Sequence, residues 1–232
     1  MSKRFWIILI AVALILGGIY FNQSKKDKTS VAKSSGSQHI EGQGKSGITL
    51  IEYGDYQCPF CGEFAPTLKQ IATIFNQQIT FQFKNLPLTQ IHQNALEAAR
   101  AAEAASLQNK FWEMHDALYA TQSQWEKLSD PTAAFTEIAK QIGLNTTKFK
   151  TDLESSAVND TINADVNDFL KTGFDEATPT FILDGKQIQP NNTVAGFTTY
   201  IQNEINKKQG KSTTATPSSS TDKNQSVQPT KK

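Results

Sequence analysis

The most informative segment of this 232-residue sequence reads Ile48-Thr-Leu-Ile-Glu-Tyr-Gly-Asp-Tyr-Gln-Cys-Pro-Phe-Cys-Gly62. Its residues 48–53 form a short apolar run rich in β-branched and aromatic side chains, which predicts a central strand covered on both faces. Gly54 interrupts this run, and Pro59 suits the first position of a helix. The segment therefore predicts a strand, a tight connection and a helix that begins at the two cysteines.

The chain has two cysteines, and both lie in this segment. At the start of a helix, free N–H groups and the helix dipole favour the thiolate of Cys58, which is expected to be the exposed, attacking sulfur. Cys61 follows one helical turn later and is expected to face inward, where it can resolve a mixed disulfide. A bridge across so short a loop adds little stability, which favours a redox role over a structural one. Asp55 is expected to cap the helix.

A CxxC pair is also half of a zinc or copper site, and this alternative stays open. Tetrahedral zinc needs four ligands, but the sequence has no second CxxC, and His39, His92 and His115 are scattered. Neither Met1 nor Met114 lies near the pair, which gives copper little support. We expect His92 and His115 to be packing or surface residues, and we expect no metal and no bound cofactor.

The rest of the chain alternates between strand and helix signals. A helical face recurs from Phe64 to Phe75, and residues 79–83 alternate in polarity as a strand does. Residues 88–173 contain several helical patterns that resemble one insertion between two halves of a sheet. Two short strand signals then flank Asp184-Gly185, a strong hairpin sequence, and a last helix comes after them. The order predicts a mixed α/β fold with an inserted helical subdomain.

Charge and composition separate a folded centre, residues 47–208, from polar flanks. The centre carries 12 Lys/Arg and 19 Asp/Glu, a net of −7, whereas residues 1–46 carry +5 and residues 209–232 carry +3. Residues 22–46 predict a flexible stalk, and residues 209–232 predict a disordered tail. Because the folded part is acidic, no nucleic-acid partner is expected. The basic flanks suit either solvated linkers or attraction to an anionic membrane.

The N-terminus carries a signal for export. Lys3 and Arg4 precede residues 5–21, a run of 17 residues without charge, whose length lies between a signal-peptide core and a short spanning helix. Basic residues before such a run favour export of the chain on its C-terminal side. Because no small-residue cleavage site directly succeeds the run, we expect residues 1–21 to be a single-pass signal anchor in the cell membrane, with secretion after cleavage as the alternative. Either outcome places the cysteine pair outside the cytoplasm.

Further segments extend the pattern around the cysteines, in the order Phe83-Lys-Asn-Leu-Pro-Leu88, His92-Gln-Asn-Ala95, Lys110-Phe-Trp-Glu-Met-His-Asp-Ala-Leu118 and Ala177-Thr-Pro-Thr-Phe-Ile-Leu-Asp-Gly185. Together with the opening segment they span roughly residues 48–206. Over this length the chain resembles the DsbA family of thioredoxin-like thiol–disulfide oxidoreductases, and is most similar to its membrane-anchored or exported bacterial members. The resemblance implies a thioredoxin-like fold.

The resemblance also implies roles for residues around the pair. Cys58 matches the reactive cysteine and Cys61 its buried partner. Thr178-Pro179 matches a loop in which a cis proline faces the disulfide and the Thr178 backbone pairs with an extended substrate peptide. Glu52 matches a buried acid that could take or give a proton as Cys61 reacts; the alternative is a partly exposed strand glutamate.

The resemblance implies that exchange at Cys58–Cys61 oxidises unfolded or reduced exported proteins, and that a membrane redox partner reoxidises the enzyme. The residues between the cysteines tune the potential, and Pro59-Phe60 lacks the histidine of the strongest oxidants of the family. An extracytoplasmic reductase or isomerase role therefore stays open. Related isomerases usually carry a dimerisation domain, which residues 22–46 cannot supply, so a monomer is expected.

Overall fold

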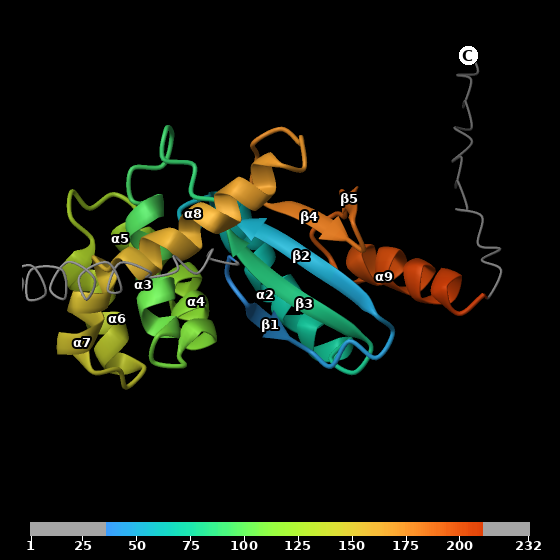
Figure 1. Cartoon of the computed structure of the whole chain (residues 1–232), viewed down its shortest axis with the longest axis horizontal. Coiled ribbons are helices and arrows are strands. Elements are labelled where there is room, and N and C mark those ends of the chain that lie inside the picture. The colour runs from blue at the N-terminus through green and yellow to red at the C-terminus, as the bar shows by residue number, and fades with distance from the viewer. Residues whose placement is uncertain (1–35, 211–232) are drawn as a thin grey trace, which may run out of the picture.

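The computed structural model describes residues 36–210 (Figure 1). A five-stranded sheet has the order β1-β3-β2-β4-β5, and its central strand β2 pairs parallel with β3 and antiparallel with β4. The apolar run of the opening segment is thus the central strand, as predicted. The strands are β1 (His39–Glu41), β2 (Ile48–Gly54), β3 (Ile79–Asn85), β4 (Thr180–Leu183) and β5 (Lys186–Ile188).

Helices pack against both faces of this sheet, α2 and α9 on one face and α8 on the other. Figure 1 shows α3 to α7 gathered beside the sheet, with α8 running from them across one of its faces. Because α3 to α8 all lie between β3 and β4 in the chain, the predicted helical insertion is confirmed. The helices are α2 (Pro59–Ile74), α3 (Ala95–Ser106), α4 (Phe111–Ala120), α5 (Gln122–Trp125), α6 (Thr132–Gln141), α7 (Thr146–Leu153), α8 (Ser156–Leu170) and α9 (Val194–Lys208).

Side-chain alternation along β2 divides the core between the two faces of the sheet. Ile48 and Leu50 point toward α2 and α9, where they pack in one cluster with Ile71 and Phe197. Tyr53 points to the opposite face and packs against Phe169 of α8. A strand covered on both faces requires apolar residues at successive positions, which explains why its sequence reads as a nearly continuous apolar run.

The stalk expectation is wrong for residues 36–46, which belong to the folded domain. β1 pairs antiparallel with β3 at one edge of the sheet. Ser37 is buried, and its backbone N–H donates to Asp165 Oδ1 at 2.8 Å. The polar composition of residues 36–46 gives no strand signal, because an edge strand of three residues needs little apolar surface. The expected anchor, the remaining stalk and most of the expected tail lie outside the described residues.

The hairpin prediction is confirmed. Asp184 and Gly185 connect β4 to β5 with positive φ angles of 49° and 82°, the combination that a tight two-residue hairpin favours. The helix after the cysteines continues through Pro66 to Ile74. Within residues 36–210, no helix is both long enough and apolar enough to cross a membrane.

Candidate active site

The two cysteines lie at the junction between β2 and α2. Cys58 is the N-cap residue, with extended backbone angles, and Pro59 occupies the first helical position. Cys61 lies within the first turn, and both thiols are free. Cys58 is 4% exposed and Cys61 is 0% exposed. The inward position of Cys61 is as predicted, but Cys58 is far less exposed than expected because the loop before β4 covers it.

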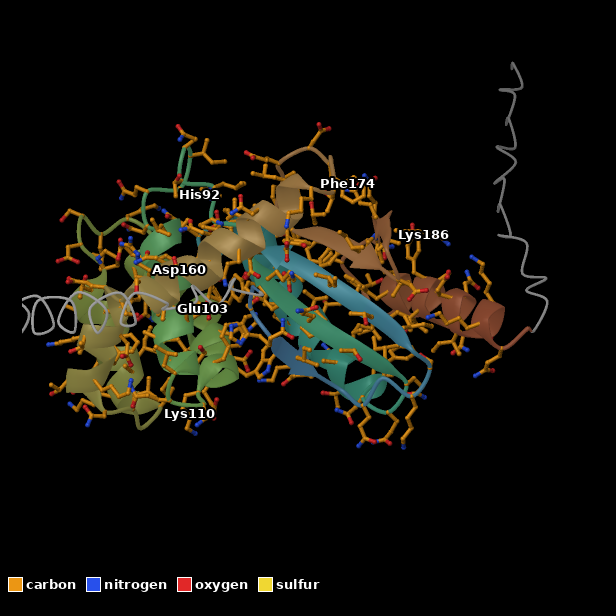
Figure 2. All side chains as sticks on the ribbon, viewed as in Figure 1. His92, Glu103, Lys110, Asp160, Phe174 and Lys186 are labelled. Atoms are coloured by element: carbon orange, nitrogen blue, oxygen red, sulfur yellow. The ribbon has the colours of Figure 1, made fainter. Side chains whose placement is uncertain are left out.

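Asp55 shapes the connection but does not cap the helix, contrary to expectation. Cys58 has no side-chain capping bond. The Asp55 carboxylate instead accepts hydrogen bonds from the backbone N–H groups of Gln57 at 2.8 Å and Leu88 at 2.9 Å, and it lies 2.7 Å from His92 Nδ1. Figure 2 labels His92 in the loop that precedes α3. Asp55 thus ties the cysteine loop to the chain that comes after β3.

The two thiols have opposite proton affinities. A hydrogen bond from Cys61 is the largest of several that together lower the pKa of Cys58 to about 6, against the opposing effect of burial; the others come from Thr178 and from the backbone N–H groups of Phe60 and Cys61. Burial raises the pKa of Cys61 well above 9, and its hydrogen bond to Cys58 and the nearby Glu52 add to this. One sulfur is therefore a thiolate at neutral pH while the other holds its proton.

Glu52 lies on β2, opposite Phe83 of β3, and is 1% exposed. The alternative of a partly exposed strand glutamate is therefore wrong. Burial, and to a smaller extent the negative charge of Cys58, raises the pKa of Glu52 to about 8. Its Oε1 atom has no hydrogen-bond partner among residues 36–210. A carboxyl that is protonated at neutral pH thus stands behind the cysteine pair.

The loop before β4 covers Cys58 from the other side. The Thr178-Pro179 peptide bond is cis, and Cys58 Sγ lies 3.3 Å from the Thr178 carbonyl oxygen, to which it donates when it is protonated. A hollow of about 340 Å³ opens beside this loop, between the cysteine helix and β5. Phe60, Phe64 and Ile188 line it, and Phe60 is 62% exposed. Residues 120 positions apart in the chain therefore enclose Cys58.

Sequence reasoning missed Gln122 of α5, in the helical insertion. Its Nε2 donates to the carbonyl oxygens of Tyr56 at 2.7 Å and Cys58 at 3.0 Å. A Cβ on Gly62 would lie 3.1 Å from Gln122 Oε1, so the glycine leaves room for this side chain. No local pattern marks a glutamine that lies 64 residues from its partner. Gln122 fixes the backbone on both sides of the cysteine loop.

Comparison with known proteins finds relatives of this chain by sequence. The family model described as Thioredoxin matches residues 34–203. The Na(+)/H(+) antiporter NhaA 1 of Salinispora arenicola is 35% identical over 149 residues, which are 64% of this chain and 22% of that protein. The corresponding protein of Mycobacterium sp. (strain KMS) is 34% identical over 153 residues, 64% of this chain and 24% of that protein. The chain thus spans less than a quarter of the length of these relatives.

Solved structures share the fold at lower sequence identity. BdbD from Bacillus subtilis has a TM-score of 0.64 and 23% identity, with 75% of this chain and 98% of that chain covered. The thiol-disulfide exchange protein alpha-DsbA2 from Wolbachia pipientis has a TM-score of 0.61 and 18% identity, with 78% and 92% covered. MdbA, a thiol-disulfide oxidoreductase from Actinomyces oris, has a TM-score of 0.60 and 16% identity, with 75% and 94% covered. The chain belongs to the thioredoxin family, and it has the fold of DsbA-type thiol–disulfide oxidoreductases.

Proposed function

We propose that this protein is a thiol–disulfide oxidoreductase that forms disulfides in exported proteins by exchange at Cys58 and Cys61. The observation that carries the proposal is the asymmetry of the pair, in which the pKa of Cys58 is lowered to about 6 and that of Cys61 is raised well above 9. Disulfide exchange requires one sulfur that is stable as a thiolate and a second that stays close behind it.

The reaction begins from the disulfide form. A substrate thiolate attacks Cys58 Sγ, the Cys58–Cys61 bond breaks, and a mixed disulfide forms at Cys58 while Cys61 leaves and takes up a proton. A second substrate thiolate then attacks the substrate sulfur and expels Cys58 as a thiolate. The substrate loses two electrons and gains a disulfide, and the enzyme becomes the dithiol. A disulfide-bearing or quinone-linked membrane partner accepts the two electrons to restore the enzyme.

The surroundings of Cys58 support an extended polypeptide as the substrate. The Thr178 carbonyl oxygen, which lies 3.3 Å from Cys58 Sγ, is a backbone group beside the reacting sulfur. An incoming peptide that adds a short strand to this loop would pair with the Thr178 backbone. Exposed Phe60 and the adjoining hollow offer apolar contact to side chains of an unfolded protein. Pro179 lines the same hollow and is the second residue that we assign to substrate binding.

Glu52 is the acid that we assign to Cys61. It is buried and its pKa is raised to about 8, so at neutral pH it holds a proton that a leaving Cys61 thiolate can accept. In the reverse step it takes this proton back. Pro59 starts the helix that stabilises the Cys58 thiolate.

The direction of electron flow is inferred from the Cys58 thiolate. A thiolate that is stabilised in the dithiol form makes the disulfide form a stronger oxidant, which favours oxidation over the alternative of a reductase or isomerase. We place the domain on the extracytoplasmic side of the cell membrane, held there as a monomer by the signal anchor over residues 1–21. Secretion after cleavage is the second possibility for the same activity.

A metal-binding role for the CxxC motif is the remaining alternative. Among residues 36–210, no group of three or more His, Cys, Asp or Glu side chains is placed to hold an ion, whereas tetrahedral zinc is bound by four ligands. Stoichiometric zinc or copper binding that blocks thiol exchange would favour this alternative over the redox role.

The activity is tested by mixing the full-length protein, in its disulfide form, with an equimolar reduced peptide that carries two cysteines. We expect the peptide disulfide to appear as the protein becomes a dithiol. The Cys58→Ser variant should transfer nothing, whereas Cys61→Ser, with Cys58 first activated as a mixed disulfide, should trap an adduct with a peptide that carries a single cysteine. A peptide that stays reduced in the presence of the wild-type disulfide form would refute the oxidase role.

A further inference from the structure

Four buried polar atoms gather on the inner side of the cysteine pair. Glu52 Oε1, Tyr56 Oη, His115 Nε2 and Tyr119 Oη have no hydrogen-bond partner among the residues that the structure describes. Buried polar atoms are nearly always paired, and each exception requires a physical explanation. The function proposed above uses only Glu52, so the other three groups have no role in it.

The four groups are contiguous. The ring centroids of Tyr119 lie 5.0 Å from those of both Tyr56 and His115, and the His115 and Tyr56 rings are 5.6 Å apart. Tyr119 Oη lies 3.1 Å from the position that a Cβ on Gly54 would take. Gly54 and Glu52 are two residues apart on β2 and therefore face the same side. Polar groups thus continue from Glu52 through the tyrosines to His115.

The far end of this row reaches the surface. His115 Nδ1 lies 3.2 Å from Asp116 Oδ1, and the Asp116 side chain is 41% exposed. If the Nδ1–H group donates to Asp116, the lone pair of Nε2 faces the tyrosines. Burial lowers the pKa of His115, and burial raises the pKa of both tyrosines well above 10. All three groups are therefore neutral near pH 7, and they can pass a proton on without holding charge.

The proposed reaction needs such a route. Each time the disulfide opens, Cys61 leaves as a thiolate and must gain one proton, and on reoxidation it must lose that proton. Cys61 is 0% exposed, and during exchange the substrate sulfur is bonded to the neighbouring Cys58. Because the substrate occupies the outer side of the pair, a proton route on the inner side would not compete with it.

We propose that Tyr119, Tyr56 and His115 form a proton relay that connects Glu52 with Asp116 at the surface. The inference rests on the proposed function. Glu52 gives its proton to Cys61; the relay then returns one proton to Glu52, and solvent replaces it at the His115–Asp116 end. On reoxidation one proton leaves by the same route. The four atoms make no direct hydrogen bond to one another, so the relay runs through bridging buried water, for which they provide the polar partners.

Charged groups on the neighbouring elements affect the pKa values of the relay residues. None of these charged groups is substituted in the variants that test the relay. The charged or titratable neighbours are Asp55 and Cys58 in the cysteine loop, Lys69 on α2, Glu103 on α3, Asp165 on α8 and His39 on β1. Differences between variants therefore report the loss of the relay groups themselves.

The test measures single-turnover oxidation of a dithiol peptide by the disulfide form of the full-length protein at pH 7 and pH 9. Without a relay, the rate depends on the fraction of molecules in which Glu52 is already protonated. For a pKa of about 8, this fraction falls from about 90% at pH 7 to about 10% at pH 9. For Tyr119→Phe and His115→Phe we expect the ratio of the pH 9 rate to the pH 7 rate to fall roughly tenfold below the wild-type ratio. Tyr53→Phe is the control, because it removes a tyrosine hydroxyl on the opposite face of β2.

The ratio separates a relay from a structural effect. A variant that is only less well packed loses rate at both pH values and keeps the wild-type ratio, and that result in Tyr119→Phe and His115→Phe would overturn the relay. An equal fall in Tyr53→Phe would also overturn it, and a fall in Tyr119→Phe alone would remove His115 from the path. A wild-type protein that oxidises no peptide refutes the proposed function, and the relay falls with it. Thermal melting of each variant verifies folding, and the two relay variants are independent tests.

Discussion

Replacing Glu52 by Gln should make the protein more stable, and the gain should grow with pH. The carboxyl has a pKa of about 8 in the folded protein, against 4.5 as its ordinary value. The folded state therefore holds the proton more tightly than the unfolded chain, and stability falls as pH rises from about 4.5 to about 8. At about 1.36 kcal/mol per pH unit, the penalty is below about 1 kcal/mol at pH 5 and about 3 kcal/mol at pH 7. A neutral glutamine avoids this penalty.

The assay is urea unfolding of the reduced proteins at pH 5 and pH 7. Between these values, the stability of Glu52→Gln relative to wild type should rise by about 2.5 kcal/mol. Cys58 has the opposite dependence, because its lowered pKa of about 6 adds stability as pH rises above that value. This contribution is common to both proteins and largely cancels in the difference. Glu63→Gln, an exposed position on α2, is the matched control and should show no such rise.

A stability difference between Glu52→Gln and wild type that stays constant from pH 5 to pH 7 would refute this reasoning. It would mean that Glu52 titrates at its ordinary value in the folded protein, and that it cannot serve as the protonated acid behind Cys61 at neutral pH. If Glu52→Gln loses the same amount of stability at both pH values in addition to the expected rise, that constant loss reports only how the amide packs. The change of the stability difference between pH 5 and pH 7 is the quantity that decides the test.

Three other substitutions test separate parts of the site. Cys61→Ala should raise the pKa of Cys58 from about 6 toward 9, because the Cys61 hydrogen bond is the largest cause of its lowering; the ultraviolet absorbance of the thiolate as a function of pH measures this, and an unchanged midpoint would contradict the cause. Gln122→Leu should cost about 1–3 kcal/mol of unfolding free energy, since it removes two hydrogen bonds to backbone carbonyls beside Cys58. The control Gln124→Leu, at an exposed position of the same helix, should not lower the unfolding free energy. Equal losses in the two variants would contradict a role for the Gln122 hydrogen bonds. Gly54→Ala should cost about 1–3 kcal/mol, because its Cβ would lie 2.5 Å from Phe83 Cε2; a melting temperature equal to that of wild type would show that Phe83 moves aside freely.

The elements around the cysteines could be predicted because their signals are local. The apolar run of β2, the Pro59 helix start and the Asp184-Gly185 hairpin each depend on a few neighbouring residues. The helical insertion could be inferred in the same way from periodic apolar positions. β1 was missed because its three residues are too few to show a periodic pattern, and its place at the sheet edge depends on pairing with β3, about 40 residues later in the chain.

The cysteine pair could be located from the sequence, but its electrostatics could not. Burial of Cys58 depends on the Thr178 loop, 120 residues away, and the hydrogen bonds of Gln122 cross from the insertion to the cysteine loop. Asp55 was assigned to the helix cap from its position, whereas the fold brings Leu88 and His92 to its carboxylate. Such long-range contacts depend on topology, which composition and spacing do not encode.

The central claim, that the pair is an oxidising thiol–disulfide centre, is tested most directly by its reduction potential. The full-length protein is equilibrated with mixtures of reduced and oxidised glutathione, and the dithiol and disulfide forms are quantified after acid quenching. A Cys58 pKa of about 6 stabilises the dithiol form, so we expect a potential well above about −200 mV and toward about −120 mV. A potential near about −270 mV, where reducing thioredoxins lie, would contradict the account.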